Sequence, residues 1–316
     1  MEEEWEAFLS ESENGTIFHS QRFLSYHRPD KFRHHHLIFM LRGKMRAIFT
    51  GAEIQSDKGL TLRSHPGASY GGIVLKRESD FEDYYGIIEA LLNYSRENGI
   101  KSLSLTQTPT IYNSCGSQGV EFALTSFGFK SAVVELTQSV NLTRLGYDAF
   151  ESVVDKTRNA CRQARKKGVI YQEDVPLSEE NIRDFYEILV ENRRALNVTP
   201  THTEEELNRL VKLIPENLHL AFAEAGGERI AGLLHFICNP RVVLLFYVCH
   251  RRDKQSLKAA PFLLTNTLNW AKREGFEQLD FGISTVKGDP NTGLLKFKEN
   301  FKTKPYLRTT YSIDLE

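Results

Sequence analysis

The sequence has few cysteines and no long apolar run. Four cysteines are spread over 316 residues, and none has the close partner that a disulfide framework or a zinc site requires (Cys115, Cys161, Cys238 and Cys249). We therefore expect four buried thiols. The longest uninterrupted apolar run, residues 242–249, has 8 residues, whereas a membrane-spanning helix needs about 20. The sequence predicts no integral membrane segment.

The chain also has almost no net charge. Its 40 Lys and Arg residues balance 41 Asp and Glu residues, which gives a net charge of -1 at pH 7. This balance excludes a polybasic protein, although charge of one sign can still gather on one element. Glutamates occupy positions 2, 3, 4 and 6, where a secretory signal would be basic and then apolar. We infer a cytoplasmic protein. A hydrophobic content of 41% is sufficient for a folded core, and the length indicates about two domains.

An internal repeat also indicates two domains. Residues 92–100 match residues 268–276 at an offset of 176, and residues 137–142 match residues 310–315 at an offset of 173. Similar offsets in the same order are typical of one duplicated unit rather than of a solenoid with many repeats. We expect a first domain over residues 1–142 and a second over residues 143–316.

Each copy predicts the same local structure. Apolar residues recur at helical spacing, a glycine follows the helix, and an alternating strand comes next, over 81–106 in the first copy and 262–283 in the second. In the second copy, three strand-like stretches precede this helix and indicate an antiparallel meander (218–224, 230–237 and 242–248). Two helices are expected before the meander, one over 179–196 and one that a capping box of Thr203 and Glu206 opens. The pattern predicts a duplicated α+β fold.

Five segments together resemble one family of enzymes. They are NGTIFHS at 14–20, PGASYGG at 66–72, the basic helix that ends at 168–169, DFGIS at 280–284 and GLLKFKENF at 293–301. Over nearly its whole length the sequence resembles the FemAB-like acyltransferases, and the Phe-Lys-x-x-Phe segment, with the Asp-Phe-Gly stretch before it, is the most specific part. The resemblance implies two tandem domains with the GNAT acyltransferase fold, each a mixed, largely antiparallel sheet flanked by helices.

The resemblance also implies an activity. Fem members transfer an amino acid from aminoacyl-tRNA to the peptide of a cell-wall precursor, and more distant relatives are N-acyltransferases of envelope or exopolysaccharide pathways. The acceptor amine would attack the donor ester or thioester directly, in a cleft between the domains. The expected partner is a phosphate-containing small molecule or glycan precursor, with charged tRNA as a further candidate. No tightly bound cofactor is expected, since aminoacyl-tRNA or acyl-CoA would be the donor substrate. The chain lacks the helical-hairpin arm that some Fem proteins insert in the second domain.

A basic helix predicted over residues 148–167 is a candidate phosphate site. Arg158, Arg162 and Arg165 stack at i, i+4 and i+7, and six basic residues lie between 156 and 168 without an acidic one. A solvated helix face with its cations near the C-terminal dipole is an equal alternative from the residues alone. The resemblance favours phosphate binding, because the corresponding helix of Fem-like enzymes lies beside the substrate's phosphates.

The short helix predicted over residues 293–301 carries the candidate catalytic lysine. Leu294, Phe297 and Phe301 share a face, and Lys298 lies at its border whereas Lys296 points away. A half-buried cation there could stabilise the oxyanion that forms when an amine attacks an acyl carbonyl. A lysine that only covers apolar surface is the alternative. The resemblance implies the catalytic role, because the lysine of Phe-Lys-x-x-Phe has it in the family.

Two further positions and one loop complete the candidate site. Asp280 could accept the amine's proton or orient the acceptor, with a turn aspartate bonded to its own backbone as the alternative. Tyr247 in the meander could bind the acceptor or leaving group, or be a core tyrosine. The resemblance places Tyr70, Gly71 and Gly72, in a glycine-rich loop, near the acceptor, because the first domain of Fem-like enzymes helps to hold it.

A coenzyme A donor normally requires the pattern Gln/Arg-x-x-Gly-x-Gly/Ala, whose amides hold the pyrophosphate at a helix N-terminus. Gln255 and Ala260 fit this pattern, but Lys258 stands at the first glycine position. Its side chain would crowd the pyrophosphate or bind phosphate in another way. Two alternatives to the Fem-like activity follow. One is an acetyl-CoA-dependent small-molecule N-acetyltransferase that uses this loop; the other is a non-catalytic duplicated domain that binds RNA or a phosphorylated glycan through the basic helix.

Three consecutive histidines, at positions 34–36, invite comparison with a metal site. On a strand only His34 and His36 would share a side, and no cysteine or acidic residue at ligand spacing completes the set. We expect surface histidines and no metal.

Overall fold

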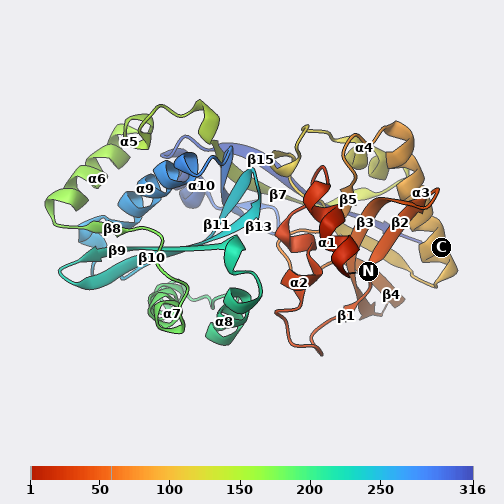
Figure 1. Cartoon of the computed structure of the whole chain (residues 1–316), viewed down its shortest axis with the longest axis horizontal. Helices are drawn as coiled ribbons and strands as arrows, with labels where there is room; N and C mark the ends of the chain where they lie inside the picture. The colour runs from red at the N-terminus through yellow and green to blue at the C-terminus, as the bar shows by residue number, and fades with distance from the viewer. Residues whose placement is uncertain (1, 58, 316) are drawn as a thin grey trace. The chain divides into compact units, whose positions relative to one another are not determined.

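The computed structural model of the chain describes residues 2–57 and 59–315. The chain forms two compact units, and Figure 1 labels many of their helices and strands. The first unit consists of Met1–Leu136, Thr285–Asp289 and Tyr306–Glu316, and the second of Thr137–Ser284 and Pro290–Pro305. Within the described residues, no helix has both the length and the apolar character needed to cross a membrane.

The sheet of the second unit has the strand order β8–β9–β10–β11–β12–β7. β9, β10 and β11 form an antiparallel meander, as predicted, with a turn at Gly226 and Gly227, which both have positive φ. β11 and β12 pair in parallel, and β12 pairs antiparallel with residues 137–141 of β7. The strands are β7 (Lys130–Asn141), β8 (Ile170–Gln172), β9 (Leu218–Ala225), β10 (Glu228–Asn239), β11 (Val242–His250) and β12 (Gln278–Ile283).

Helices cover both faces of this sheet (Figure 1). On one face, Phe185 of α7 packs against Gly232 of β10. On the other, Trp270 of α9 stacks on His219 of β9, with ring centroids 3.8 Å apart. The capping box that starts α8 is present as predicted. The helices of this unit are α5 (Ala149–Ser152), α6 (Asp155–Lys166), α7 (Glu179–Arg194), α8 (Glu204–Leu213), α9 (Ala259–Arg273) and α10 (Thr292–Glu299), with the 3-10 turns η3 (Leu142–Arg144), η4 (Pro215–Asn217) and η5 (Gln255–Leu257).

The basic helix is not continuous, so the prediction of one helix over 148–167 is wrong. α5 ends after a single turn, Val153 has extended backbone, and α6 begins at Asp155. A helix end leaves carbonyls without intrahelical partners. Arg158 satisfies three of them with its guanidinium (Phe150, Glu151 and Val153). The apolar residues around the break fit a helical period, which is why the sequence pattern missed it.

The first unit is also α+β. Its sheet has the order β1–β3–β4–β6–β15, and β2 and β5 pair with β3. Helix α3 starts at a capping box on Asp80 and ends before Gly99, whose φ of 68° gives the predicted left-handed cap. The helices are α1 (Glu2–Glu11), α2 (Gln21–Leu24), α3 (Phe81–Glu97) and α4 (Gly119–Ser126), with η1 (Ile17–His19) and η2 (Thr110–Tyr112). The strands are β1 (Arg33–His34), β2 (Leu37–Leu41), β3 (Lys44–Ser56), β4 (Gly59–Ser64), β5 (Gly72–Leu75), β6 (Ser102–Thr106) and β15 (Lys304–Asp314); β13 (Thr285–Val286) and β14 (Asp289–Pro290) form a separate ribbon.

The α+β class, with largely antiparallel sheets flanked by helices, is therefore confirmed. The cysteine prediction is right in part. All four cysteines are free, and Cys161, Cys238 and Cys249 are buried. Cys115 is exposed, contrary to the prediction, and its thiol donates to the Glu13 carboxylate at 3.0 Å.

The last strand of each sequence copy completes the sheet of the other unit. The repeat makes β6 equivalent to β12, and the end of β7 equivalent to the end of β15. In the structure β15 pairs with β6, with Asp314 opposite Ser102, and β7 pairs with β12, with Asn141 opposite Gln278. The offset of 176 relates Ser102 to Gln278, and the offset of 173 relates Asn141 to Asp314. The two strand pairs therefore have the same register. The predicted domains, 1–142 and 143–316, follow the two sequence copies, and this division into two GNAT-like domains stays a prediction.

Candidate active site of the second unit

Strands β11 and β12 separate at the candidate site. Their parallel pairing joins residues 242–244 to residues 278–280. Beyond Asp280 the described part of β12 has no pairing with β11, so its carbonyl groups need donors from elsewhere. Lys298 of α10 supplies them, since its Nζ donates to the carbonyl oxygens of Gly282 at 2.7 Å and Ile283 at 2.9 Å. The predicted catalytic lysine therefore lies where the two strands part.

Lys298 is a buried cation. It is 5% exposed, whereas Lys296 on the same helix is exposed, as the helical spacing predicts. Burial lowers the pKa of Lys298 from 10.5 to about 8, and the negative charge of Asp280 opposes part of this shift. The ammonium form still predominates at pH 7. Hydrogen bonds among the described residues use two of its three N–H donors, which leaves one for a ligand.

The predicted apolar face of α10 is only partly covered. Phe301 is buried beside Phe281, with ring centroids 5.4 Å apart. Leu294 and Phe297, in contrast, are 36% and 38% exposed. The helix is therefore held in place by its C-terminal end and by Lys298, while two of its apolar side chains remain accessible.

Asp280 belongs to the same buried polar cluster. Its Oδ1 accepts hydrogen bonds from Thr137 Oγ1 at 2.6 Å and from the backbone N–H of Gly282 at 2.8 Å. The second bond is the local turn contact expected of an aspartate two residues before its partner. The first bond ties the carboxylate to β7. Asp280 and Lys298 thus both bind the segment that follows the separation of the strands.

Gln138 is a further member of this cluster that the sequence patterns did not single out. Its Oε1 accepts from Ser284 Oγ at 2.7 Å, and its Nε2 donates to Thr303 Oγ1 at 3.2 Å and Leu295 O at 3.4 Å. These bonds connect β7 with α10 and with the residues on either side of it. The available signal was a run of polar residues, 137–139, inside a strand of the repeat.

The three arginines of α6 have different surroundings. Arg158 is occupied at the helix break and also pairs with Asp155 at 3.1 Å. The guanidinium of Arg165 lies over the ring of Phe150, 4.0 Å from its centroid, in a cation–π contact. Arg162 is exposed and donates to Asn159 at 3.2 Å. Arg162 and Arg165 are both exposed, so a phosphate can reach either side chain.

Lys258 has a glycine-like backbone at the start of α9. Its φ and ψ of 60° and 32° lie in the left-handed region, which costs most residues about 1–2 kcal/mol. Its side chain does not cap the helix, so the first N–H groups of α9 can receive an anion. Gln255, at the start of η5, is exposed. Lys167 donates to the carbonyl of Ser256 at 2.8 Å, which brings the basic end of α6 beside this loop.

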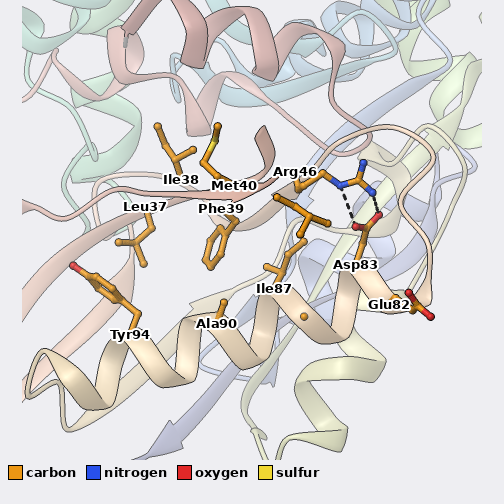
Figure 2. Close-up of a pocket in the computed structure, with 12 residues that line it drawn as sticks. Leu37, Ile38, Phe39, Met40, Arg46, Glu82, Asp83, Ile87, Ala90 and Tyr94 are labelled. Atoms are coloured by element: carbon orange, nitrogen blue, oxygen red, sulfur yellow. Dashed lines mark hydrogen bonds and ion pairs between the residues drawn. The ribbon is translucent and has the colours of Figure 1, made fainter. Parts of the chain in front are cut away.

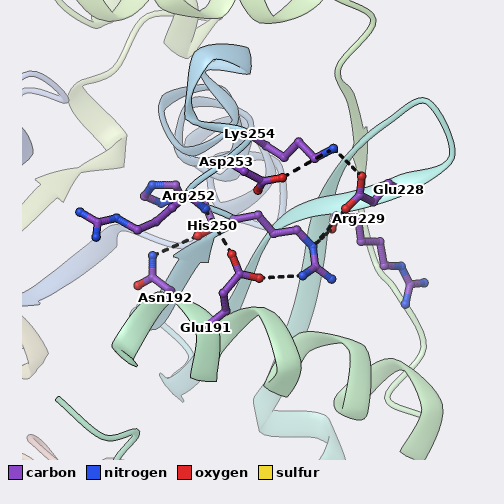
Figure 3. Close-up of polar contacts among 9 residues, drawn as sticks. Glu191, Asn192, Glu228, Arg229, His250, Arg252, Asp253 and Lys254 are labelled. Atoms are coloured by element: carbon purple, nitrogen blue, oxygen red, sulfur yellow. Dashed lines mark hydrogen bonds and ion pairs between the residues drawn. The ribbon is translucent and has the colours of Figure 1, made fainter. Parts of the chain in front are cut away.

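Ion pairs fix the beginning of the same loop (Figure 3). Arg251 pairs with Glu191 of α7 at 2.7 Å and with Glu228 of β10 at 3.4 Å. Lys254 pairs with Glu228 at 2.9 Å. Solvent screens exposed pairs such as these, so their main effect is on the position of the loop. Together they attach the segment after β11 to two elements of the second unit and so define the position of the turn that contains Lys258.

Tyr247 lies in the core of the second unit. Its hydroxyl accepts a hydrogen bond from the backbone N–H of His202 at 3.0 Å, and its ring lies 6.1 Å from that of Phe185. Burial raises the pKa of the phenol. Among the described residues no hydrogen bond joins Tyr247 to Lys298 or Asp280, so its role at a substrate stays a prediction.

The glycine-rich loop belongs to the first unit. Tyr70 is buried against Phe18, with ring centroids 4.8 Å apart. Gly72 has a φ of 86°, and a Cβ there would lie 2.1 Å from Gln107 Oε1, so a glycine is required. Gly71 donates to the end of β6. The loop is packed within its own unit, and contact with an acceptor stays a prediction.

The consecutive histidines are less exposed than predicted. His34 is exposed, but His35 and His36 are half-buried. His34 Nδ1 lies 3.0 Å from His65 Nε2. Within residues 2–57 and 59–315, no three histidine, cysteine or acidic side chains gather in a way that could hold a metal ion.

Residues 153–299 match the family model of an acetyltransferase (GNAT) domain. This segment contains α6, the meander, the loop before α9, and the cluster of Asp280 and Lys298. The expected resemblance to the FemAB-like, GNAT-fold acyltransferases is confirmed. No curated protein matches the chain by sequence.

Solved structures are similar in fold over nearly the whole chain. The crystal structure of FemX has a TM-score of 0.77 and 11% identity, and covers 100% of this chain and 96% of its own. The C-terminal domain of a putative lysylphosphatidylglycerol synthetase from Agrobacterium fabrum has a TM-score of 0.62 and 12% identity, and covers 98% and 90%. A tandem GNAT protein from the clavulanic acid biosynthesis pathway has a TM-score of 0.52 and 11% identity, and covers 93% and 87%. At these identities the likeness concerns the fold, which is that of tandem GNAT proteins.

Proposed function

We propose that this acyltransferase moves an acyl or aminoacyl group onto an amine of a phosphate-containing cell-envelope or exopolysaccharide precursor. The observation that carries the proposal is the buried ammonium of Lys298 at the separation of β11 and β12. The GNAT match over residues 153–299 supports acyl transfer. The likeness in fold to FemX and to the putative lysylphosphatidylglycerol synthetase supports an envelope acceptor and an aminoacyl donor.

In the proposed reaction the acceptor amine attacks the carbonyl carbon of the donor ester or thioester. A C–N bond forms, a tetrahedral oxyanion develops, and the C–O or C–S bond then breaks. Lys298 donates its remaining N–H to the oxyanion, where a preorganised cation in a dry site is most effective. Asp280 orients the amine or receives its proton in transit, and the departing alcohol or thiol finally takes that proton. No covalent enzyme intermediate is required.

The test of this role compares Lys298→Met with Lys296→Met. Loss of one oxyanion donor reduces turnover by about 10²–10³-fold, and we expect that loss for Lys298→Met alone. The same variant should lose about 1–3 kcal/mol of stability, because the partly buried carbonyls of Gly282 and Ile283 lose their donor. Lys296→Met removes an equal charge from the exposed side of α10 and should change neither property. Turnover per folded molecule that is equal in both variants would contradict the role of Lys298.

An acetyl-CoA-dependent small-molecule N-acetyltransferase is the second candidate, and the backbone of Lys258 favours it. The left-handed conformation of Lys258 keeps the turn that a glycine would form before α9, so the sequence departure does not change the loop shape. Lys167 and Lys258 would then attract the phosphates of a nucleotide donor to the N-terminus of α9. In this arrangement the lysine replaces the glycine without loss of the anion site.

Substitutions at Lys258 test this second candidate. Lys258→Gly keeps the turn and removes one positive charge, so coenzyme A should still bind, although more weakly than to the parent. Lys258→Glu places a negative charge beside the phosphates, and we expect at least tenfold weaker binding in titration calorimetry. Equal affinity in the two variants would exclude this loop as the coenzyme A site.

One screen separates the candidate donors. Thermal shifts are measured with acetyl-CoA, a longer acyl-CoA, charged tRNA and a UDP-linked sugar precursor, and each ligand that binds is then tested in an amine-acylation assay. Turnover with charged tRNA or with acyl-CoA identifies the carrier. Binding of RNA or of the sugar precursor without turnover would support instead the non-catalytic module, acting through Arg162 and its neighbours on α6.

A further inference from the structure

A cavity of about 480 Å³ lies in the first unit between β2 and α3 (Figure 2). Its walls are mainly apolar, and Phe39 points from β2 towards Ile87 and Ala90 of the helix (Figure 2). Its size is within the range of about 300–1,000 Å³ that is typical of small-molecule sites. Met40 and Leu41, which also line it, are 57% and 54% exposed. The cavity is therefore open to ligands from outside and consists entirely of residues of the first unit.

Gly86 provides part of the space in this cavity. It lies in the middle of α3 with helical backbone, so its conformation does not require glycine. A Cβ added there would meet no atom within 4 Å, so close packing does not require glycine either. A glycine inside a helix costs about 1 kcal/mol relative to alanine. The residue thus weakens the helix and leaves room for a ligand beside it.

The charged groups of the cavity lie at one end. Arg46 donates to the carboxylate of Asp83 in a bidentate ion pair, and Glu82 lies next to them (Figure 2). Among the described lining residues, one positive and two negative side chains therefore leave a net charge of -1 at this end. A ligand that fills the apolar part would place a positively charged group here.

From the apolar walls, the helix-interior glycine and the negative end, we propose that this cavity binds the hydrocarbon tail of an amphiphile with a positively charged head. The tail lies along α3 over Gly86 and Ala90, and the head lies beside Glu82. This site is separate from the cluster of Lys298 and Asp280, and its test does not depend on the transfer reaction.

Binding of alkyltrimethylammonium ions of increasing chain length, below their micelle-forming concentrations, tests the proposal by titration calorimetry. Each buried CH₂ contributes about 0.8 kcal/mol, so affinity should rise about fourfold per carbon until the cavity is full. Undecanoate, which has the same ten-carbon tail, should bind more weakly than decyltrimethylammonium, and Glu82→Gln should reduce that difference. Affinity that does not depend on chain length, or undecanoate that binds as tightly as the cation, would overturn the proposal.

Gly86→Leu and Ala90→Phe fill the cavity, and each should weaken binding of decyltrimethylammonium at least tenfold. Gly86→Leu also replaces a helix-interior glycine, so its melting temperature without ligand should equal or exceed that of the parent. Glu89→Leu is the matched control, because it adds the same side chain to α3 at a position that does not line the cavity. Unchanged affinity in both filled variants would overturn the proposal. Light scattering gives a second check. If the parent protein is a dimer and Gly86→Leu dissociates it, a second copy of the chain covers the cavity, and the proposal is overturned.

Discussion

Two buried histidines of the second unit form a hydrogen-bonded pair on the ring of Trp270. His219 Nδ1 lies 2.9 Å from His235 Nδ1, and His219 Nε2 lies 2.9 Å from the carboxylate of Asp174. Burial lowers the pKa of His219 to about 4, although Asp174 opposes the shift and Arg273 adds to it. Burial also lowers the pKa of His235 well below its usual value, and His219 adds to that shift. Both imidazoles are therefore neutral in the folded protein near pH 7.

This pair predicts a loss of stability in acid. Between pH 6.5 and about 4 the unfolded chain binds protons at positions 219 and 235 that the folded chain excludes, so stability falls as the pH falls through this window. Each such proton changes the free energy of unfolding by about 1.4 kcal/mol per pH unit. His235→Met removes one titrating group, and we expect a smaller slope of unfolding free energy against pH in urea denaturation. A slope equal to that of the parent would show that His235 does not contribute.

Single residues were predictable where helical or strand spacing decides their environment. The spacing of Leu294, Phe297 and Phe301 correctly identified Lys298 rather than Lys296 as the buried lysine. Spacing did not predict that Lys298 binds the carbonyls of β12. Those carbonyls lack a partner in β11 because the two strands separate, which local sequence does not show. The role of Gln138 was not predicted for the same reason.

On the scale of elements, the break between α5 and α6 changes how the row of Arg158, Arg162 and Arg165 is interpreted. Arg158 donates to a carbonyl at the break, and Arg165 packs on Phe150. Only Arg162 combines exposure with a single neutral hydrogen-bond partner in the described contacts. The three arginines look equivalent on a helical wheel, but Arg158 is occupied at the break, whereas Arg162 and Arg165 are exposed.

Substitutions on α6 should separate these two roles. Arg158→Ala leaves three carbonyls without their donor and should lower stability by about 1–3 kcal/mol. Arg162→Ala should change stability by less than about 0.5 kcal/mol, yet weaken the binding of a UDP-linked sugar precursor in titration calorimetry. Arg194→Ala, on α7 across the sheet, is the control for the loss of one exposed charge. If Arg162→Ala binds the precursor like the control, α6 is a solvated face.

Most elements of the second unit were predictable because each has its own local signal. The meander, the capping box of α8 and the strand at 278–283 all occur where alternation, caps and turn residues place them. The helix break had no such signal, since it depends on the side chain of Arg158, six residues after the end of α5. The fold class was thus predictable from the sequence, whereas this helix boundary was not.

At the scale of the whole molecule, the exchange of strands means that a sequence copy and a compact unit are different segments of chain. A fragment of residues 137–305 keeps the residues of β7 that pair with β12. A fragment of residues 143–316 loses them and retains β15 without β6. The repeat indicates that β15 could then replace β7, with Thr310 in the place of Thr137 and Tyr311 in the place of Gln138.

We therefore expect fragment 137–305 to be the more stable of the two. A tyrosine cannot make the hydrogen bonds of Gln138 to Ser284 and Thr303, and unsatisfied buried partners cost about 1–3 kcal/mol. Urea denaturation, followed by circular dichroism, should show a higher midpoint for 137–305. Equal midpoints, or a higher one for 143–316, would mean that β7 is not an integral part of the second unit.

The conserved register of the exchanged strands also suggests a history. If the ancestor was a single GNAT domain, exchange of the last strand between two identical molecules would have given a domain-swapped dimer. Joining the two genes would have made that dimer one polypeptide and left the two copies free to diverge. From then on neither copy could be deleted without exposing a sheet edge of the other, so the fusion would be difficult to reverse.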